Sequence, residues 1–310
     1  MDEEKKDIFK KHGYALTGEE SGVKLCHWIS EKLIEGRSCY KEDFYGIDCH
    51  RCLQMSPALD VCNQNCLFCW RYQDYGERKE KDLEFDDPEE IVERSIEAQK
   101  KLVSGFRGDQ RCSEDMWREA REPNQVAISL SGEPSMYPRL GELIEEYEKR
   151  GMTTFLVSNG TRPDVLEELE DLPTQLYITL AAPNEEIFKK LCVPNTASLW
   201  DRVKESLDLL PSLDTRTVVR HTLVKDWNIG WESEYADLVK RGDPDFIEAK
   251  GYVFVGDSRR RMTIDNMPSH DTIKGFAERE ADLLGLETLQ EKESSRVVLL
   301  GSVDSRQKIE

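Results

Sequence analysis

Residues 62–70 read CNQNCLFCW and place three cysteines, Cys62, Cys66 and Cys69, at spacings of four and three. Thiolates are the soft ligands that zinc and iron–sulfur clusters prefer. A structural zinc site takes four ligands, usually as two Cys-x-x-Cys pairs, and a ferredoxin-like cluster takes a fourth cysteine in register. Because this loop offers only three, it can hold a four-iron cubane and leave one iron open. The motif therefore indicates a reactive cluster.

Downstream of this loop, short apolar runs alternate with longer amphipathic stretches. We expect strands at 58–61, 126–131, 153–158, 175–180, 217–224 and 246–255, with a last apolar run at 296–300. We expect helices at 88–102, 139–150, 164–170, 184–191, 198–210, 232–240 and 271–284. The charged stretch 105–123 is expected to be an inserted, solvated loop with a short helix.

This alternation of strands and helices predicts the fold class. It is typical of α/β proteins with a parallel sheet or a β/α barrel joined by right-handed crossovers. Five or six such units after residue 56 predict a partial barrel. In such barrels the chemistry lies at the C-terminal ends of the strands. The loop at 62–70, which follows the first expected strand, is in that position.

The composition is that of an acidic protein without a membrane segment. In 310 residues, 43 Lys and Arg oppose 62 Asp and Glu, so the formal net charge is −19. No run of about 18 apolar residues occurs, and the charged N-terminus lacks the apolar stretch of a signal peptide. We therefore expect a cytoplasmic protein with no membrane partner. The average negative field would repel nucleic acid, which by itself favours an enzyme with a small-molecule substrate.

The nine cysteines are clustered, because seven of them lie between Cys26 and Cys69. Disulfides are rare in cytosolic chains, so this density indicates metal or cofactor chemistry. We expect Cys112 and Cys192, outside the cluster, to be small buried hydrophobic residues.

A second cysteine set lies upstream of the loop, and it contains Cys26, Cys39, Cys49 and Cys52. Cys26, Cys39 and Cys52 are separated by two steps of 13. Residues 49–52, Cys-His-Arg-Cys, resemble half of a zinc ribbon that Cys26 and Cys39 would complete. From the residues alone, a four-cysteine zinc site remains open.

The cysteine loop resembles that of the radical S-adenosylmethionine superfamily, in which an aromatic residue precedes the last cysteine. Two later stretches agree: SGEP at 131–134 after the second expected strand, and VSNGT at 157–161 after the third. The resemblance implies a 4Fe-4S cluster on Cys62, Cys66 and Cys69, with S-adenosyl-L-methionine on its open iron. It also implies cofactor-binding roles for the residues that would contact the methionine amino group (Ser131, Gly132, Glu133), the ribose (Ser158, Asn159) and the adenine (Phe68). The alternatives are core packing for Phe68 and a solvated loop acid for Glu133.

Further stretches resemble the archaeal tRNA 4-demethylwyosine synthases, and they are 126–134, 177–185, 220–225, 246–252 and 265–270. The similarity runs from about Tyr14 to the C-terminus. It implies a partial (β/α)6 radical-SAM barrel over residues 56–310, with a C-terminal extension, and an N-terminal Cys-rich helical extension over residues 1–55. It assigns Cys26, Cys39 and Cys52 to an auxiliary 4Fe-4S cluster and leaves Cys49 as a bystander.

The resemblance also implies a reaction, of the carbon–carbon lyase type. An adenosyl radical takes hydrogen from N1-methylguanosine at position 37 of tRNA(Phe), and the new carbon radical adds to pyruvate, whose carboxyl carbon is lost. The eukaryotic relatives carry a flavodoxin-like domain for which this chain has no room. We therefore expect an external electron donor of the flavodoxin or ferredoxin type.

Pyruvate has to be held, and two modes are open. Its oxygens could bind the open iron of the auxiliary cluster, or its ketone could form a Schiff base with a lysine of lowered pKa. Lys41, two residues from Cys39, is the first catalytic candidate, and Lys250 is the second. A solvated surface charge is the alternative role for each.

Handling of tRNA requires positive charge and a base that can leave its stack. Arg259, Arg260 and Arg261 follow a late strand and are our candidates for tRNA binding. Arg220, also on a late strand, is a candidate ligand for a carboxylate or phosphate. Three aromatic residues after the cysteine loop could stack on bases or pack as a lid: Trp70, Tyr72 and Tyr75.

Two other functions remain open at this point. A radical activating enzyme would abstract hydrogen from a partner protein, and a non-catalytic zinc protein would use the same cysteines structurally. The iron and sulfide content of the anaerobically purified protein separates these from a two-cluster enzyme.

Overall fold

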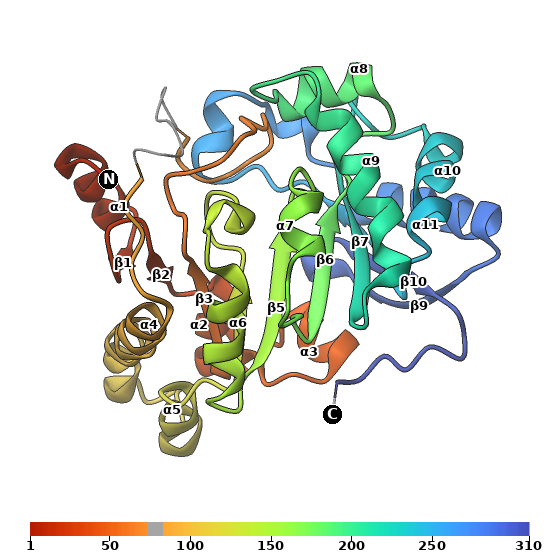
Figure 1. Cartoon of the computed structure of the whole chain (residues 1–310). Coiled ribbons are helices and arrows are strands. Elements are labelled where there is room, and N and C mark those ends of the chain that lie inside the picture. Colours follow the sequence, from red (N-terminus) through yellow and green to blue (C-terminus); the bar gives the residue numbers. More distant parts are fainter. Residues whose placement is uncertain (74–82, 310) are drawn as a thin grey trace.

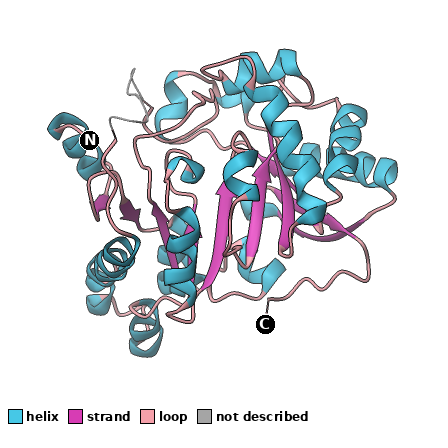
Figure 2. Cartoon of the chain, viewed as in Figure 1, coloured by secondary structure: helices cyan, strands magenta, loops and turns pink. Residues whose placement is uncertain are grey.

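The centre of the computed structural model, which describes residues 1–73 and 83–309, is one ten-stranded sheet. Its order is β1-β2-β3-β4-β5-β6-β7-β8-β10-β9 (Figures 1 and 2). The six strands from β3 to β8 run parallel to one another, which confirms the predicted α/β barrel of six units. They are β3 (Cys52–Ser56), β4 (Gln125–Ile128), β5 (Thr153–Ser158), β6 (Gln175–Thr179), β7 (Arg216–Leu223) and β8 (Phe246–Gly251).

Antiparallel strands extend the sheet at both edges. A hairpin of β1 (Tyr14–Leu16) and β2 (Gly22–Lys24) pairs with β3, while β10 (Val297–Gly301) and β9 (Glu287–Lys292) follow β8. The N-terminal helices are α1 (Glu3–Lys11), α2 (His27–Glu35) and α3 (Tyr40–Tyr45). The sequence did not predict the hairpin, because strands of three residues are too short to show alternation.

Helices cover the outer side of the sheet, as Figures 1 and 2 show. They are α4 (Pro88–Leu102), α6 (Leu140–Glu148), α7 (Pro163–Glu167), α9 (Leu199–Leu209), α10 (Glu232–Gly242) and α11 (His270–Leu284). α4 begins as predicted, because Asp87 caps the amide of Glu89 and Pro88 needs no donor at the first helical position. No helix in the described ranges is long and apolar enough to cross a membrane.

Side chains of the parallel strands alternate between two cores. On the outer side, Val126 and Leu156 belong to the main core beneath the helices. On the inner side, Phe155 and Tyr177 pack in a second core with Tyr45 of α3. α3 therefore fills part of the barrel interior, and the inner residues closer to the C-terminal ends of β7 and β8 lie beyond this apolar plug.

The predicted strand at 58–61 is wrong. The first barrel strand is β3, and residues 58–61 form a loop in which the amide of Leu59 donates to the carbonyl of Glu20 over 2.7 Å. Ala58 and Leu59 are fully buried in this loop. A short apolar run cannot by itself distinguish a buried loop from a buried strand.

Three other stretches differ in detail. β8 ends at Gly251, not at 255, and the run at 296–300 forms the antiparallel β10. The helix expected at 184–191 is a single turn, α8 (Glu185–Ile187), followed by a π-helix over Phe188–Cys192. The insertion at 105–123 contains the expected short helix, α5 (Glu114–Ala120), although Trp117 within it is buried.

Candidate active site

The cysteine loop leaves the C-terminal end of β3 and is clamped by the segment 191–195. The amides of Asn65 and Leu67 donate to the carbonyls of Val193 and Leu191 over 3.0 and 2.9 Å. The amide of Asn195 donates to the carbonyl of Asn63 over 3.0 Å. Val193 has φ +45°, a conformation that β-branched residues rarely adopt. The π-helix and this turn together set the backbone of the clamp.

Gly132 holds the loop after β4 against the loop after β3. It has φ +69°, and a Cβ there would lie 1.8 Å from the carbonyl oxygen of Ala58. The neighbouring residues add hydrogen bonds. The Ser131 hydroxyl donates to the carbonyl of Leu59 over 3.0 Å, and the amide of Glu133 donates to the carbonyl of Val61 over 2.7 Å. Only glycine fits this close approach.

Glu133 is a buried acid, so the alternative of a solvated loop acid is wrong. Its carboxylate accepts hydrogen bonds from the hydroxyls of Ser135 and Ser158 over 2.7 and 2.8 Å and from the amide of Asn159 over 2.8 Å. Burial raises the pKa of Glu133, although these donors act in the opposite direction. The carboxylate therefore ties the ends of β4 and β5 together.

Asn159 continues this network to the cysteine loop. Its Nδ2 donates to Asn63 Oδ1 over 2.9 Å and lies 3.9 Å from the Sγ of Cys62. Its Oδ1 accepts from the amide and hydroxyl of Thr161. The ends of β3, β4 and β5 thus converge beside the first cysteine of the motif.

The donor set of this loop fits a cubane better than a single ion. No group of three or more Cys, His, Asp or Glu side chains within residues 1–73 and 83–309 is arranged to hold one metal ion. Thiolates that bind different irons of a cubane stand farther apart than the ligands of one ion. Burial raises the pKa of Cys62 and Cys69 and so keeps the free thiols neutral, whereas coordination to a metal would deprotonate them.

The structure shows how deeply three further side chains are buried, those of Phe68, Cys112 and Cys192. Phe68 is half-buried and packs against the apolar cores on either side of the loop, as in the alternative of core packing. Cys192 is buried as expected, whereas Cys112 is only partly buried, because it lies in the inserted segment on the surface. A hydrogen bond with Cys192 and burial raise the pKa of Cys66.

The segment that carries the three arginines expected to bind tRNA lies against the end of the cysteine loop, where the amide of Asp257 donates to the carbonyl of Trp70 over 3.0 Å, but the arginines differ in exposure. Arg259 and Arg260 are exposed, and Arg260 pairs with Asp257 at 3.4 Å. Arg261 instead donates to the backbone carbonyls of Leu67 and Cys69, which belong to the cysteine loop. Trp70 is 40% exposed beside this segment. Tyr75 lies outside the described residues.

The upstream cysteines gather at the start of β3. Cys26 and Cys39 are the N-cap residues of α2 and α3, and Cys52 is the first residue of β3. Burial raises the pKa of Cys26 and of Cys52, and Cys39 lies close enough to raise both further, while Cys26 also raises that of Cys52. A hydrogen bond with Cys49 lowers the pKa of Cys39, and the role of Cys49 as a bystander stays a prediction.

Charged residues meet in the barrel interior above α3. The carboxylate of Glu248 accepts from Arg220 Nε over 2.8 Å and from the Tyr45 hydroxyl over 2.7 Å. Lys41 Nζ lies 4.3 Å from the centre of the Phe155 ring. Lys250 Nζ lies 4.3 Å from the centre of the Tyr40 ring. The structure thus brings together Lys41, Lys250 and Arg220, which the sequence selected separately.

The environment favours the neutral amine of both lysines. Burial and the charge of Arg220 lower the pKa of Lys41 to about 8 and that of Lys250 to about 8. Burial alone would lower the pKa of Arg220, but Glu248 raises it, so its charge is retained. Neutral amines beside a fixed cation can attack the carbonyl of an anionic keto acid.

Sequence reasoning missed Glu248 and Tyr45. Both act through contacts between distant segments, since β7 and β8 pair Arg220 with Glu248 in register. The available signal was the spacing of two between Glu248 and Lys250, which places both on one face of a strand.

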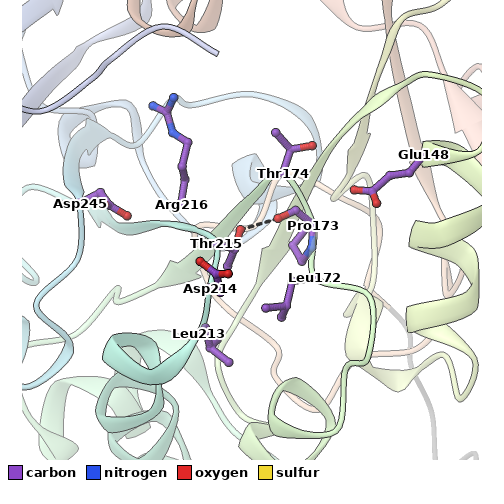
Figure 3. A pocket seen from close by; sticks show the side chains of 9 residues that line it. All are labelled: Glu148, Leu172, Pro173, Thr174, Leu213, Asp214, Thr215, Arg216 and Asp245. Atoms are coloured by element: carbon purple, nitrogen blue, oxygen red, sulfur yellow. Dashed lines mark hydrogen bonds between the residues drawn. The ribbon is translucent and has the colours of Figure 1, made fainter. Parts of the chain in front are cut away.

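One cavity of about 480 Å³ lies at the opposite end of the barrel, near the starts of β6 and β7. Figure 3 shows Glu148, Asp214, Arg216 and Asp245 around it. It is lined by none of the candidate residues, and we assign it no role in the chemistry.

Two family models match the chain: the Radical SAM superfamily over residues 57–239 and wyosine base formation over residues 241–302. The S-adenosyl-L-methionine-dependent tRNA 4-demethylwyosine synthase of Pyrococcus abyssi (strain GE5 / Orsay) is 49% identical over 304 residues, which are 97% of this chain and 89% of that protein. A solved structure of TYW1 with a lysine-pyruvate adduct bound has a TM-score of 0.89 and 38% identity, covering 100% of this chain and 98% of that chain. A crystal structure of archaeal TYW1 has a TM-score of 0.83 and 34% identity, covering 100% of both chains.

Proposed function

The chain belongs to the family of S-adenosyl-L-methionine-dependent tRNA 4-demethylwyosine synthases within the radical SAM superfamily, and from that premise we propose the reaction that it catalyses. It joins N1-methylguanosine at position 37 of tRNA(Phe) to two carbons of pyruvate and so builds the third ring of 4-demethylwyosine. Neither the radical activating enzyme nor the non-catalytic zinc protein is favoured by these relatives.

In this proposal the residues at the C-terminal ends of β3, β4 and β5 bind the cluster and S-adenosyl-L-methionine. Cys62, Cys66 and Cys69 hold the 4Fe-4S cluster that binds S-adenosyl-L-methionine. When bound, the two supply a radical that takes hydrogen from the N-methyl group of the base. The loops after β4 and β5 orient the methionine and ribose through Ser131, Gly132, Glu133, Ser158 and Asn159. The interlocked hydrogen bonds of Glu133 and Asn159 support this assignment.

Lys41 is the residue that binds pyruvate covalently in this proposal. Its amine attacks the ketone carbon and forms an imine with release of water, and Arg220 attracts the carboxylate. The lowered pKa of Lys41, next to Arg220 and Glu248, supports this role. A solved relative with a lysine-pyruvate adduct supports the same chemistry. Lys250 is the second candidate.

The remaining partners complete the proposal. Cys26, Cys39 and Cys52 hold an auxiliary 4Fe-4S cluster, while Arg259 and Arg260 contact the anticodon loop at the barrel mouth. An external flavodoxin or ferredoxin supplies electrons, and the reaction takes place in the cytoplasm. The chain divides into an extension over residues 1–55 and a barrel over residues 56–310, with β3 spanning the boundary.

The test combines nucleoside analysis with chemical trapping. Anaerobic protein is incubated with tRNA(Phe), S-adenosyl-L-methionine, pyruvate and a reductant, and the nucleosides are identified by mass spectrometry. Separately, cyanoborohydride with pyruvate should add a reduced adduct to the peptide that contains Lys41. Lys41→Ala should abolish both the adduct and the tricyclic nucleoside.

The control is Lys274→Ala, which removes an exposed lysine of α11 and should change neither readout. An adduct that disappears only in Lys250→Ala would transfer the role to Lys250. Full product formation by Lys41→Ala, Lys250→Ala and the double variant would exclude the imine.

A further inference from the structure

Arg71 is a buried cation that has no carboxylate partner among residues 1–73 and 83–309. Arg71 is only 5% exposed, and its Nη1 donates to the Tyr14 hydroxyl over 3.1 Å. No carboxylate within the described ranges forms an ion pair with it. A buried guanidinium is costly unless an opposite charge compensates it. The side chains in the part of the chain that the structure describes do not provide that charge.

A second cation increases the imbalance. Lys24 Nζ lies 4.9 Å from the centre of the Tyr14 ring and 5.6 Å from that of Trp70. The Arg71 guanidinium stacks on the same Trp70 ring at 3.2 Å. Burial and the charge of Arg71 lower the pKa of Lys24. Two like charges therefore share two aromatic rings, whose faces attract cations only weakly.

These cations lie between the two cysteine sets. Arg71 follows Cys69 by two residues, and its side chain bonds to the Tyr14 hydroxyl of the β1–β2 hairpin. Tyr14 pairs with Lys24 in the β1–β2 hairpin, and Cys26 follows Lys24 by two residues. The charge of Arg71 acts on the sulfurs of both Cys69 and Cys26. One guanidinium thus bridges the cysteine loop and the upstream set.

A 4Fe-4S core bound by thiolates can supply the missing negative charge. An oxidised core of charge +2 with three thiolates has a net charge of −1. After it accepts one electron from an external donor, the net charge is −2. A nearby fixed cation in a poorly solvated site stabilises the reduced form more than the oxidised form.

We propose that Arg71 is the shared counter-ion of the two iron–sulfur sites and raises the reduction potential of the cluster that binds S-adenosyl-L-methionine. The two-site part rests on the auxiliary cluster of the proposed function. Arg71 is a positioning residue here, because it acts on electron transfer through the clusters and touches no substrate.

The experiment is a redox titration of the anaerobic holoprotein, followed by electron paramagnetic resonance of the reduced clusters. Arg71→Gln should shift the midpoint potential of the cluster on Cys62, Cys66 and Cys69 to a more negative value. Arg71→Lys, which keeps the charge, should recover most of the wild-type potential. Arg121→Gln is the matched control, because Arg121 also stacks on a tryptophan, Trp117, at 4.8 Å but lies on the inserted segment.

Further variants separate an effect of Arg71 on the potential from loss of iron, from the auxiliary cluster and from the condensation reaction. If Arg71→Gln fails to retain iron, Lys24→Gln decides, since loss of that cation should shift the same potential in the same direction. In Cys39→Ala, which removes a ligand of the auxiliary cluster, Arg71→Gln should still lower the potential of the remaining cluster. Product formation is measured separately, so failure of the condensation would leave these potentials interpretable.

An unchanged midpoint potential in an iron-replete Arg71→Gln protein would overturn the proposal, as would an unchanged potential in Lys24→Gln where Arg71→Gln does not retain iron. If tRNA binding is weakened in the same variant, these cations belong to a phosphate-binding surface instead.

Discussion

Glu248 balances the charge of the barrel interior at the scale of single residues. It is fully buried and bonds to Arg220 and Tyr45, while the charges of Lys41 on α3 and of Lys250 on its own strand, β8, also act on it. Burial would raise the pKa of Glu248, but Arg220 and the Tyr45 hydrogen bond lower it. The acid is therefore ionised and compensates the charge of Arg220 beside the two lysines.

Replacing this acid should destabilise the protein. Glu248→Gln leaves Arg220 as an uncompensated buried charge, and breaking a buried pair in this way costs about 3–5 kcal/mol. Urea unfolding of the anaerobic holoprotein measures the loss of unfolding free energy. Arg220→Gln should be destabilising as well, because it leaves Glu248 unpaired.

The double variant Glu248→Gln, Arg220→Gln serves as the control for this pair. It removes both charges, so its cost should fall short of the sum of the single variants by about 0.5–3 kcal/mol. Strict additivity would mean that the two side chains do not stabilise each other.

At the level of residues, roles that depend on a short local motif could be predicted, whereas contacts between segments far apart in the sequence could not. Glu133 and Asn159 could be selected because each lies in a short motif after an expected strand. Glu248 could not, because its partners come from β7 and α3, which only the folded sheet brings near it. The bonds of Arg261 to the cysteine loop could not be predicted either, because they join segments 194 residues apart, and its role in tRNA binding stays a prediction.

At the scale of elements, the loops after β3 and β4 form one interlocked unit. The contact depends on Gly132, since a Cβ would meet the carbonyl oxygens of Ala58 and Val61 at 1.8 and 2.6 Å. Both oxygens belong to backbone, which cannot move without displacing Cys62. The geometry of the first cluster therefore depends on a residue that binds no iron.

Gly132→Ala should lower the iron content by about half, from two clusters to one, because it displaces only the cysteine loop. Iron and sulfide analysis after anaerobic reconstitution measures this loss. Gly151→Ala is the matched control, because Gly151 has φ +72° and nothing within 4 Å of the added Cβ. It should cost about 1–2 kcal/mol in backbone strain and keep all the iron. Equal iron in both variants would contradict the interlocked loops.

Elements with a long periodic pattern were predictable, and the others were not. α4 was placed at 88–102 because fifteen residues show one apolar face between clear caps. β3 was misplaced because its five residues alternate between the outer core and the barrel interior, while the following loop carries the more apolar run. The π-helix at Phe188–Cys192 has no sequence signal distinct from that of an α-helix.

At the scale of the whole molecule, a net charge of −19 and a tRNA substrate are compatible if charge is distributed by face. Acids on the outer helices are largely matched locally, as where Glu146 of α6 pairs with Lys149 and Arg150. Arg259 and Arg260 are exposed on a different face, in the segment that contacts the cysteine loop and the exposed Trp70. We propose that tRNA meets this face. Net charge alone therefore misled the first expectation of a small-molecule substrate, because it reports an average over all faces.

The double variant Arg259→Ala, Arg260→Ala should weaken tRNA binding and flatten its salt dependence, because each phosphate contact releases counterions. For single-stranded loops or duplex stems, two lost contacts correspond to a reduction of about 1.4–1.8 in the slope of log K against log salt. Filter binding at several salt concentrations measures both quantities, while cleavage of S-adenosyl-L-methionine without tRNA should stay unchanged. The matched control, Arg107→Ala with Arg118→Ala, removes the same charge near α5, which lies far from the barrel mouth (Figure 1). An equal loss of slope in both variants would mean that tRNA senses only the overall charge, and the arginines at the mouth would then have no specific role.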